Sequence, residues 1–393
     1  MRAIYLDNNA TTAVDPEVVA AMLPFFTDHY GNASSSHGLG ASVAGAVREA
    51  RRSVCDLIGA AHEQEIVFTS GGTESDNAAI LSALETDRGR DEIVVSAVEH
   101  PALLALTAYL ARHRGIAVHH VPVDERGRLD VDAYRAVLGP RTAIVSVMWA
   151  NNETGALFPI AELAALAKQA GAVFHTDAVQ AVGKQPVDVK ATPVDMLSLS
   201  AHKFHGPKGI GALYVRKGVP FHPLIRGGKQ ERGRRGGTEN VPGIVGLGKA
   251  AAQARVRLPQ DLDRVRDLRD RLGQGIIQRV PGAVVVGGTV GRIANTTNIA
   301  FDRADAEPIL GSLDKEGIAA SSGSACSSGS VEPSHVLRAM AVKFTAIHGA
   351  LRFSLSRQNV ESDVDRVLAV LPQIVERARA VSVFAPSDAG ART

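Results

Sequence analysis

Two charged residues follow apolar segments that have the composition of buried strands. Lys203 comes just after the segment 195–200, and Asp177 directly follows the apolar run 172–176. A lysine amine that is partly deprotonated can form a Schiff base with a carbonyl compound. A carboxylate at the end of a buried strand needs a cationic partner. Alone, each residue is better explained as a solvated loop lysine or a helix-capping aspartate. Together they favour pyridoxal phosphate, whose enzymes pair such a lysine with an aspartate on the protonated ring nitrogen.

A glycine pair marks the turn between a predicted strand and a predicted helix. Gly71 and Gly72 lie in this turn, followed by Thr73. Here the backbone can approach a ligand closely, and the N-terminus of the helix offers free N–H groups to an anion. The turn is neither a Walker A motif nor GxGxxG, and such turns are about as often without a ligand. Ser200 and His202 could donate further hydrogen bonds to the same phosphate.

Two further residues could act on a substrate. His100 ends the stretch 94–100 and could stack on a flat ring or move protons near neutral pH; locally, a capping or core histidine is slightly favoured. Arg352 alternates with Leu351 and Phe353, so it points to the opposite face of a strand from that pair. A guanidinium can bind a substrate carboxylate through two hydrogen bonds, although a surface arginine is equally compatible with the pattern.

The two cysteines lie in contrasting segments. Cys326 belongs to the serine- and glycine-rich segment 321–330, which has almost no apolar residue to anchor it. We predict an exposed loop there, with Cys326 as a nucleophile that moves with it; an incidental cysteine in a linker is the alternative. Cys55 lies among apolar residues of a predicted helix over 42–58, so we expect a structural role.

A local basic run spans 226–235. It could bind RNA, line a cofactor pocket, form a subunit contact or remain a solvated loop, but it lacks the aromatic residues that stack on bases.

Another candidate cluster is the pair His119 and His120. These adjacent residues face opposite ways on a predicted strand, which is poor metal-ligand geometry. We therefore assign no metal to the protein itself.

The composition limits the class of protein. The chain has 393 residues, of which 45% are hydrophobic and 21% charged, with a net charge of +2. This is typical of a globular enzyme of two or three domains, and the charge balance argues against a dedicated nucleic-acid binder. Two cysteines favour a reducing, cytoplasmic setting. No apolar run approaches the ~20 residues of a membrane span, and we expect no signal peptide.

Apolar strands and helical patterns alternate from 64 to 215, which predicts an α/β fold with a mostly parallel sheet covered on both faces. Ligands of such sheets bind beyond the carboxyl ends of the strands. The pattern changes near Pro259. An amphipathic helix over 261–278, short strands at 283–286 and 295–301 and a second long helix over 362–381 predict a smaller α+β domain.

These motifs together resemble one family. They are LDNNATT (6–12), SGGTESDN (70–77), VEHP (98–101), NNETG (151–155), HTDAVQ (175–180), SAHK (200–203), RRGGTEN (234–240) and SSGSAC (321–326). The chain resembles the cysteine desulfurases of the class V aminotransferase group, close to the nitrogen-fixation type, from about residue 4 to about residue 383. Ala201 stands where glycine is expected, and 341–350 is less typical of the family.

The resemblance implies a fold-type-I pyridoxal-phosphate enzyme that works as a homodimer. Its large domain would span 13–258, with a seven-stranded sheet, and its small domain would combine 1–12 with 259–393. The implied cofactor contacts are Gly72, Thr73, Asn152, Asp177, Gln180, Ser200, His202, Lys203 and, from the other subunit, Thr238. Lys203 would carry the Schiff base and His100 would stack on the ring. Arg352, with Asn152, would bind the substrate.

The activity implied is the conversion of L-cysteine to L-alanine, with a persulfide formed on Cys326. The sulfur would pass to an acceptor scaffold protein for iron–sulfur cluster assembly, with nitrogenase maturation as one candidate use. The persulfide could touch an iron–sulfur cluster transiently; we expect no nucleic acid or membrane as a partner. Two alternatives stay open: another pyridoxal-phosphate reaction, such as selenocysteine lysis or transamination, and an RNA-binding protein built on 226–235.

Overall fold

The computed structural model describes residues 3–87, 89–289, 291–322, 333–382 and 384. Its largest sheet has seven strands in the order β2-β8-β7-β6-β5-β3-β4. Only β8 runs antiparallel to its neighbours, so the predicted α/β fold with a mostly parallel sheet is confirmed. The strands are β2 (Ile66–Thr69), β3 (Glu92–Ser96), β4 (Ala117–Val121), β5 (Thr142–Ser146), β6 (Val173–Asp177), β7 (Met196–Ser200) and β8 (Gly211–Val215).

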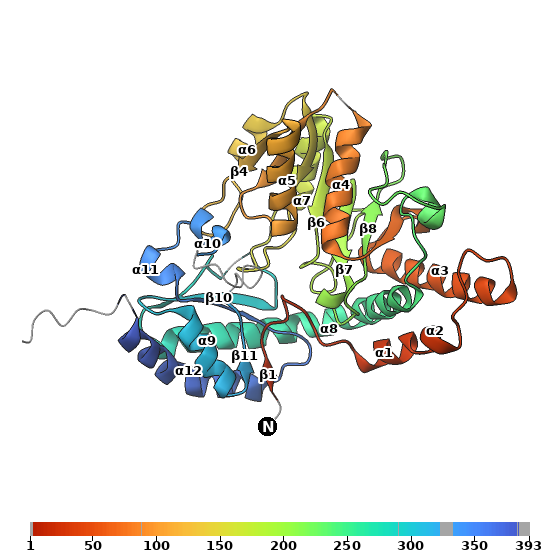
Figure 1. The fold of residues 1–393 in the computed structure, drawn as a ribbon. Coiled ribbons are helices and arrows are strands. Elements are labelled where there is room, and N and C mark those ends of the chain that lie inside the picture. Colours follow the sequence, from red (N-terminus) through yellow and green to blue (C-terminus); the bar gives the residue numbers. More distant parts are fainter. Residues whose placement is uncertain (1–2, 88, 290, 323–332, 383, 385–393) are drawn as a thin grey trace, which may run out of the picture.

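Helices cover both faces of this sheet (Figure 1). Neighbouring residues of β3 show this, because Val94 packs in one apolar cluster while Ile93 and Val95 pack in another. The cluster of Ile93 includes residues of α4 (Gly72–Thr86) and α5 (Pro101–Arg114). The cluster of Val94 includes residues of α3 (Gly38–Ile58), α7 (Ile160–Gln169) and α8 (Val241–Arg279). Strands buried on both faces are apolar throughout, which is why the sequence predicted them well.

The alternation of strands and helices expected between 64 and 215 is confirmed. The remaining helices of this part are α1 (Pro16–Met22), α2 (Pro24–Thr27), α3 (Gly38–Ile58), α6 (Val131–Val137) and α7 (Ile160–Gln169), with short 3-10 turns η1 (Glu63–Glu65), η2 (Ala201–Lys203) and η3 (Gln230–Gly233). Asp177 is the last residue of β6 and Lys203 ends η2, directly after β7. Both therefore lie at carboxyl ends of neighbouring strands, as predicted.

The predicted start of the helix over 261–278 is wrong. The helix α8 begins at Val241 and runs unbroken to Arg279, with Pro259 inside it. A proline inside a helix removes a hydrogen bond and costs ~3 kcal/mol. Packing on both sides outweighs this cost: Leu247 is buried in the first cluster and Leu272 in a second one. Tertiary burial thus overrides the local signal at Pro259.

The second cluster lies between α8, α9 and α12 and two small sheets. One sheet has the order β12-β10-β9 and the other pairs β1 with β11 in parallel. These elements are β1 (Ile4–Tyr5), β9 (Ala283–Val285), β10 (Thr296–Phe301), α9 (Ala306–Lys315), β11 (Ile318–Ala319), α10 (His335–Ala339), α11 (Phe344–Ile347), β12 (Ala350–Ser354) and α12 (Glu361–Val381). No helix within the described residues is long and apolar enough to cross a membrane.

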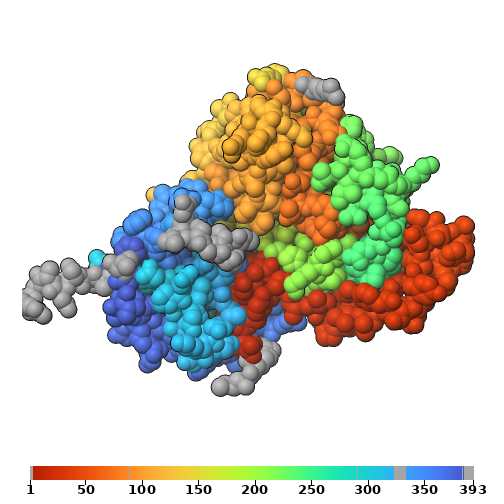
Figure 2. Space-filling model, in the orientation of Figure 1, coloured from red at the N-terminus to blue at the C-terminus, as the bar shows by residue number. Residues whose placement is uncertain are grey.

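The segment 7–12 links the two apolar clusters. Ile4 and Leu6 pack in the second cluster, while Thr12 N donates to His202 O beside the large sheet. Figure 2 shows the start of the chain (red) between the C-terminal part (blue) and the large sheet's part (green). This segment therefore lies where the two parts of the molecule meet.

Candidate active site

A pocket of about 270 Å³ lies at the carboxyl ends of the central strands. Nine of the predicted site residues line it: Gly72, Thr73, His100, Asn152, Asp177, Gln180, Ser200, His202 and Lys203. The fold brings them together because β3, β6 and β7 are parallel, so the segments that follow these strands meet at one edge of the sheet. Five further residues line the pocket without having been predicted as site residues: Ala10, Asp76, Met148, Ala150 and Val179.

The glycine turn before α4 leaves the first turn of the helix open. Gly71 precedes the helix with φ of 154°, and it places no capping side chain over the N-terminus. A Cβ added to Gly72 would lie 2.8 Å from Val179 Cγ2, so this position has no room for a side chain. Glu74 holds the turn from the other side, accepting from Ser70 N at 2.8 Å. The result is a cradle of backbone N–H groups suited to an anion.

Asp177 is buried at the floor of the pocket. Its Oδ1 accepts from Val179 N at 2.9 Å. Burial raises the pKa of this carboxyl, whereas His100 and Lys203 act to lower it. Its neighbour Asp76 is also buried, and Asp76 Oδ1 has no hydrogen-bond partner within the described part of the chain. Burial and the charge of Asp177 raise the pKa of Asp76. Two buried carboxyls beside one pocket favour a cationic group bound in it.

His100 caps α5 and lines the pocket at the same time. Its Nδ1 accepts from Ala102 N at 3.1 Å, so in the neutral ring the proton is on Nε2. The capping interpretation is therefore correct, but it leaves the ring face and Nε2 available for other contacts. Burial lowers the pKa of His100, which keeps the ring neutral near pH 7.

Lys203 is held by the N-terminal segment. Its Nζ donates to Asn9 O at 2.6 Å and to Ala10 O at 2.9 Å. Asn9 O also accepts from Gln180 Nε2 at 3.0 Å, so the lysine and the glutamine share one carbonyl. In the sequence, only the motif at 6–12 indicated that this segment belongs to the site. The contact itself could not be predicted, because every residue has a backbone carbonyl whatever its type.

Arg352 lies beside the pocket without lining it. The side chain is 3% exposed, and its Nη1 donates to Asn152 O at 3.1 Å. Leu351 and Phe353 pack in the second cluster, so Arg352 does point to the opposite face. Its backbone pairs with Ser321, where the serine- and glycine-rich segment begins. Cys326 itself lies outside the described residues.

Two arginines of the basic run 226–235 pair with acidic side chains of their own chain. Arg226 pairs with Glu85 at 2.9 Å, and Arg235 Nε pairs with Glu74 at 3.0 Å beside the glycine turn. These contacts favour a structural role for the run over an RNA-binding one. Thr238, just after it, is exposed and does not line the pocket of its own chain. Among the residues that the structure describes, no group of three or more His, Cys, Asp or Glu could hold a metal ion.

Comparison with known proteins identifies the family. The family model described as aminotransferase class-V matches residues 4–367. A cysteine desulfurase of Gluconacetobacter diazotrophicus is 63% identical over 393 residues, covering all of this chain and 98% of that protein.

The chain belongs to the cysteine desulfurases of the class-V aminotransferase family.

Other similar proteins agree with this assignment. Cysteine desulfurase NifS of Azotobacter vinelandii is 56% identical over 384 residues, covering 98% of this chain and 95% of that protein. A solved structure described as a NifS-like protein superposes with a TM-score of 0.89 at 37% identity, covering 95% of this chain and all of that one. The predicted family and fold type are therefore confirmed.

Members of this family use pyridoxal phosphate, and the pocket fits that group. The glycine turn suits its phosphate, and Asp177 suits its protonated ring nitrogen. The face of His100 suits its aromatic ring, and the Lys203 amine in the same pocket suits its aldehyde group. Asp76 also lines the pocket; its Oδ1, which has no hydrogen-bond partner within the described part of the chain, lies 3.6 Å from Nε2 of the buried His175. The residues present are therefore those that this cofactor needs.

Proposed function

We propose that this chain is a homodimeric cysteine desulfurase that converts L-cysteine to L-alanine and leaves the sulfur as a persulfide on Cys326. One observation carries the proposal: Lys203, Asp177 and His100 meet in one pocket, and Arg352 lies beside it. In the net reaction the C–S bond of cysteine breaks and an S–S bond forms. The carbon that bore sulfur is reduced to the methyl group of alanine, and the sulfur of Cys326 is oxidised to the persulfide.

Pyridoxal phosphate, when bound, supplies an electron sink that makes the Cα proton of the amino acid acidic. Gly72, Thr73, Ser200 and His202 would hold its phosphate, with Thr238 of the other subunit, and Asn152 and Gln180 would contact its ring substituent. Asp177 would hold the proton on its ring nitrogen. Each of these roles is our proposal.

The chain's own groups do the rest. The Lys203 amine takes the Cα proton of the substrate and returns a proton at the next step. Arg352 binds the substrate carboxylate, with Asn152 beside it. His100, neutral near pH 7, accepts and donates the thiol protons through Nε2. The Cys326 thiolate attacks the substrate sulfur, since the thiolate is the nucleophilic form of cysteine.

Delivery of the sulfur implies a partner. We propose that the persulfide passes to a scaffold protein on which iron–sulfur clusters are assembled, and that it contacts the cluster only transiently. We propose nitrogenase maturation as one use of that sulfur; a similar protein of Azotobacter vinelandii is named cysteine desulfurase NifS. Because the reaction needs Cys326 reduced, we place the enzyme in the cytoplasm.

We also propose a division into two domains, 13–258 and 1–12 with 259–393. The second apolar cluster supports it, since its members among the described residues come from 4–6 and 265–378; the first cluster takes in some residues of 286–350 as well. The boundary then falls inside α8, at Pro259.

The test is to incubate the purified protein with L-cysteine and a reducing thiol, and to measure alanine and sulfide together. Equal yields over many turnovers would support the proposal. Absence of alanine from cofactor-loaded protein would overturn the substrate assignment. A parallel assay with L-selenocysteine tests the alternative activity. Alanine formed from L-selenocysteine but not from L-cysteine would identify a selenocysteine lyase.

A further inference from the structure

Lys184 lies next to the proposed active site, and neither the motifs nor the proposed mechanism uses it. It is partly buried, and its Nζ donates to Gln180 Oε1 at 2.6 Å and to Asn9 Oδ1 at 3.1 Å. Burial, Lys203 and Arg352 lower the pKa of its amine. Even a neutral amine keeps two N–H groups, one for each of these acceptors. The contacts therefore do not depend on the charge of Lys184.

These contacts fix the orientation of the Gln180 amide. Its oxygen and nitrogen could in principle exchange places by a half turn, since the two groups have the same shape. Asn9 O is a carbonyl and can only accept, so the amide nitrogen must face it, at 3.0 Å. Lys184 then occupies the amide oxygen from the other side. One N–H of Gln180 is used by Asn9, and the second N–H stays available to the pocket that Gln180 lines.

Asn9 is itself fixed by a complete set of hydrogen bonds. Its side-chain nitrogen donates to Asn152 O at 3.0 Å and to Thr296 Oγ1 at 2.8 Å, and its oxygen also accepts from Asn295 Nδ2 at 3.0 Å. The acceptor that faces Gln180 therefore has little freedom to move. Lys184 joins the two residues, because it donates to both of them.

We propose that Lys184 is a positioning residue: by holding the amide oxygen of Gln180, it turns an N–H of Gln180 toward the ring oxygen of pyridoxal phosphate. This inference rests on the proposed function, in which Gln180 contacts that substituent. Without Lys184, Gln180 loses one of its two fixed contacts, so Asn9 O alone opposes a half turn of the amide; that half turn would present an acceptor to an oxygen that bears negative charge. The cofactor would then bind more weakly, and its anionic form would be less stable.

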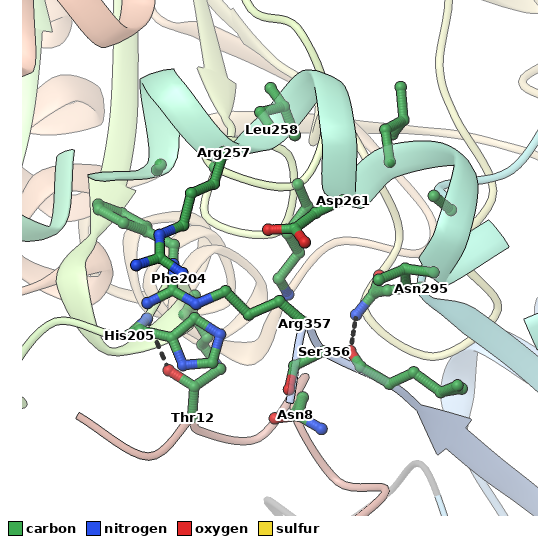
Figure 3. Close-up of a pocket in the computed structure, with 18 residues that line it drawn as sticks. Asn8, Thr12, Phe204, His205, Arg257, Leu258, Asp261, Asn295, Ser356 and Arg357 are labelled. Atoms are coloured by element: carbon green, nitrogen blue, oxygen red, sulfur yellow. Dashed lines mark hydrogen bonds between the residues drawn. The ribbon is translucent and has the colours of Figure 1, made fainter. Parts of the chain in front are cut away.

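The space around Lys184 allows a conservative variant. Lys184 and Lys203 line a cavity of about 60 Å³ on the side of α8, together with the residues labelled in Figure 3. Asn295 closes one side of it by donating to Leu355 O (Figure 3). A longer side chain at 184 has room there, so Lys184→Arg can keep N–H donors for both acceptors.

The test compares holoenzymes without substrate. The variants are K184M, K184R, Q180L, the double variant Q180L/K184M, and the control K190M at an exposed lysine six residues away. Two quantities are measured: the pH midpoint of the visible absorption band of the lysine-bound cofactor, and the dissociation constant for pyridoxal phosphate. Asp177, His100, His202, His205 and Arg352, which face Lys203 or Lys184 with titratable or charged groups, are the same in every variant.

K184M should raise the midpoint by about one pH unit, because a hydrogen bond to a charged group is worth about that much. It should also weaken cofactor binding about tenfold, whereas K184R and K190M should leave both values near those of the wild type. In the Q180L background, K184M should add little, since Lys184 acts through Gln180. If K184M does not fold, K184Q is measured in its place. The new glutamine side chain can present either its nitrogen or its oxygen to Gln180. The midpoint and the dissociation constant should therefore shift in the same direction as in K184M, but by less.

An unchanged midpoint and dissociation constant in K184M, or in K184Q where that is used, would overturn the role of Lys184. Equal effects of K184M with and without Gln180 would also overturn it, because Lys184 would then act on its own. A wild-type protein that develops no band of lysine-bound cofactor would overturn the proposed function, and this inference with it.

Discussion

Arg352 Nη2 lies 2.7 Å from Asp7 Oδ1, and this ion pair joins β12 to the N-terminal segment beside the pocket. Arg352 also donates to Asn152 O, yet its Nε is buried with no hydrogen-bond partner in the described part of the molecule. A buried donor without a partner is rare in folded proteins. The unused Nε is therefore where we expect an oxygen of the substrate carboxylate to bind.

Arg352→Lys tests this contact. Lysine cannot offer the planar fork of donors that binds a carboxylate through two hydrogen bonds. Loss of one partner of a buried charged pair costs about 2–5 kcal/mol, so kcat/KM for L-cysteine should fall about 100-fold, mainly through KM. Steady-state kinetics measure this. Arg112→Lys, at an exposed position on α5, is the matched control. An unchanged KM in Arg352→Lys would contradict the assignment.

Cys326→Ala should keep the bound cofactor but stop sulfide release, because no thiolate remains to take the sulfur. Sulfide and alanine assays with the absorption spectrum check both parts. Cys55→Ala is the control: Cys55 is buried in α3, burial raises its thiol pKa to about 12, and its removal should cost about 1 kcal/mol of stability without loss of activity. Full activity of Cys326→Ala would refute its role as nucleophile.

Lys203→Ala should abolish turnover, since the amine that moves the Cα proton is lost. Alanine formation over hours would measure any residual rate. The thermal stability of the variant should change little, because water can reach the carbonyls of Asn9 and Ala10, to which Lys203 donates, once the side chain is truncated. Lys190→Ala, at an exposed lysine, controls for removal of a positive charge. Persistent turnover in Lys203→Ala would mean that another group is the base.

The pH dependence of kcat/KM should reflect the buried His100. Burial lowers its pKa below the usual 6.5, so the neutral ring persists as the pH falls through 6.5. We therefore expect the acidic limb of the profile that belongs to His100 to lie below pH 6.5, and to disappear in His100→Gln. A profile measured from pH 5 to 9 for both proteins decides this. A His100-dependent limb at or above 6.5 would show that the ring is charged near neutrality.

His175 should make the stability depend on pH. It is fully buried between Ser146 and Ser198, at 2.8 and 2.9 Å, and burial lowers its pKa to about 3. Below pH 6.5 the unfolded chain binds this proton and the folded chain does not, so the free energy of unfolding falls with pH, from 6.5 down to about 3. The loss is ~1.4 kcal/mol per pH unit.

Urea denaturation at pH 6.5 and 5.5 would measure this contribution of His175. The wild type should lose about 1 kcal/mol more over that interval than His175→Gln, which has no such proton to bind. Comparing the change in unfolding free energy between these pH values in the wild type and in His175→Gln removes the effect of other buried groups. Asp76 and Asp177 are such groups, and their raised pKa values act in the opposite direction. An equal change in both proteins would mean that His175 accepts a proton in the folded state.

Much of this molecule could be predicted from the sequence. The apolar strands of the large sheet stand out because a parallel sheet is buried on both faces. Lys203 and Asp177 stand out because charged residues at the ends of such strands are costly unless they have a function. The shared direction of the strands then brings these residues to one edge. The motifs added the family, which the comparisons confirm.

Only the tertiary structure decided the partners of these residues. Asn9 and Lys203 are 194 positions apart, and Asp7 and Arg352 are 345 apart; such contacts depend on how the N-terminal segment crosses between the two apolar clusters. Lys184 has no distinctive neighbours in the sequence, and its position matters because the fold places its amine between Gln180 and Asn9. Local patterns determine strands, helices and residue types, whereas packing determines which carbonyl or carboxylate each side chain meets.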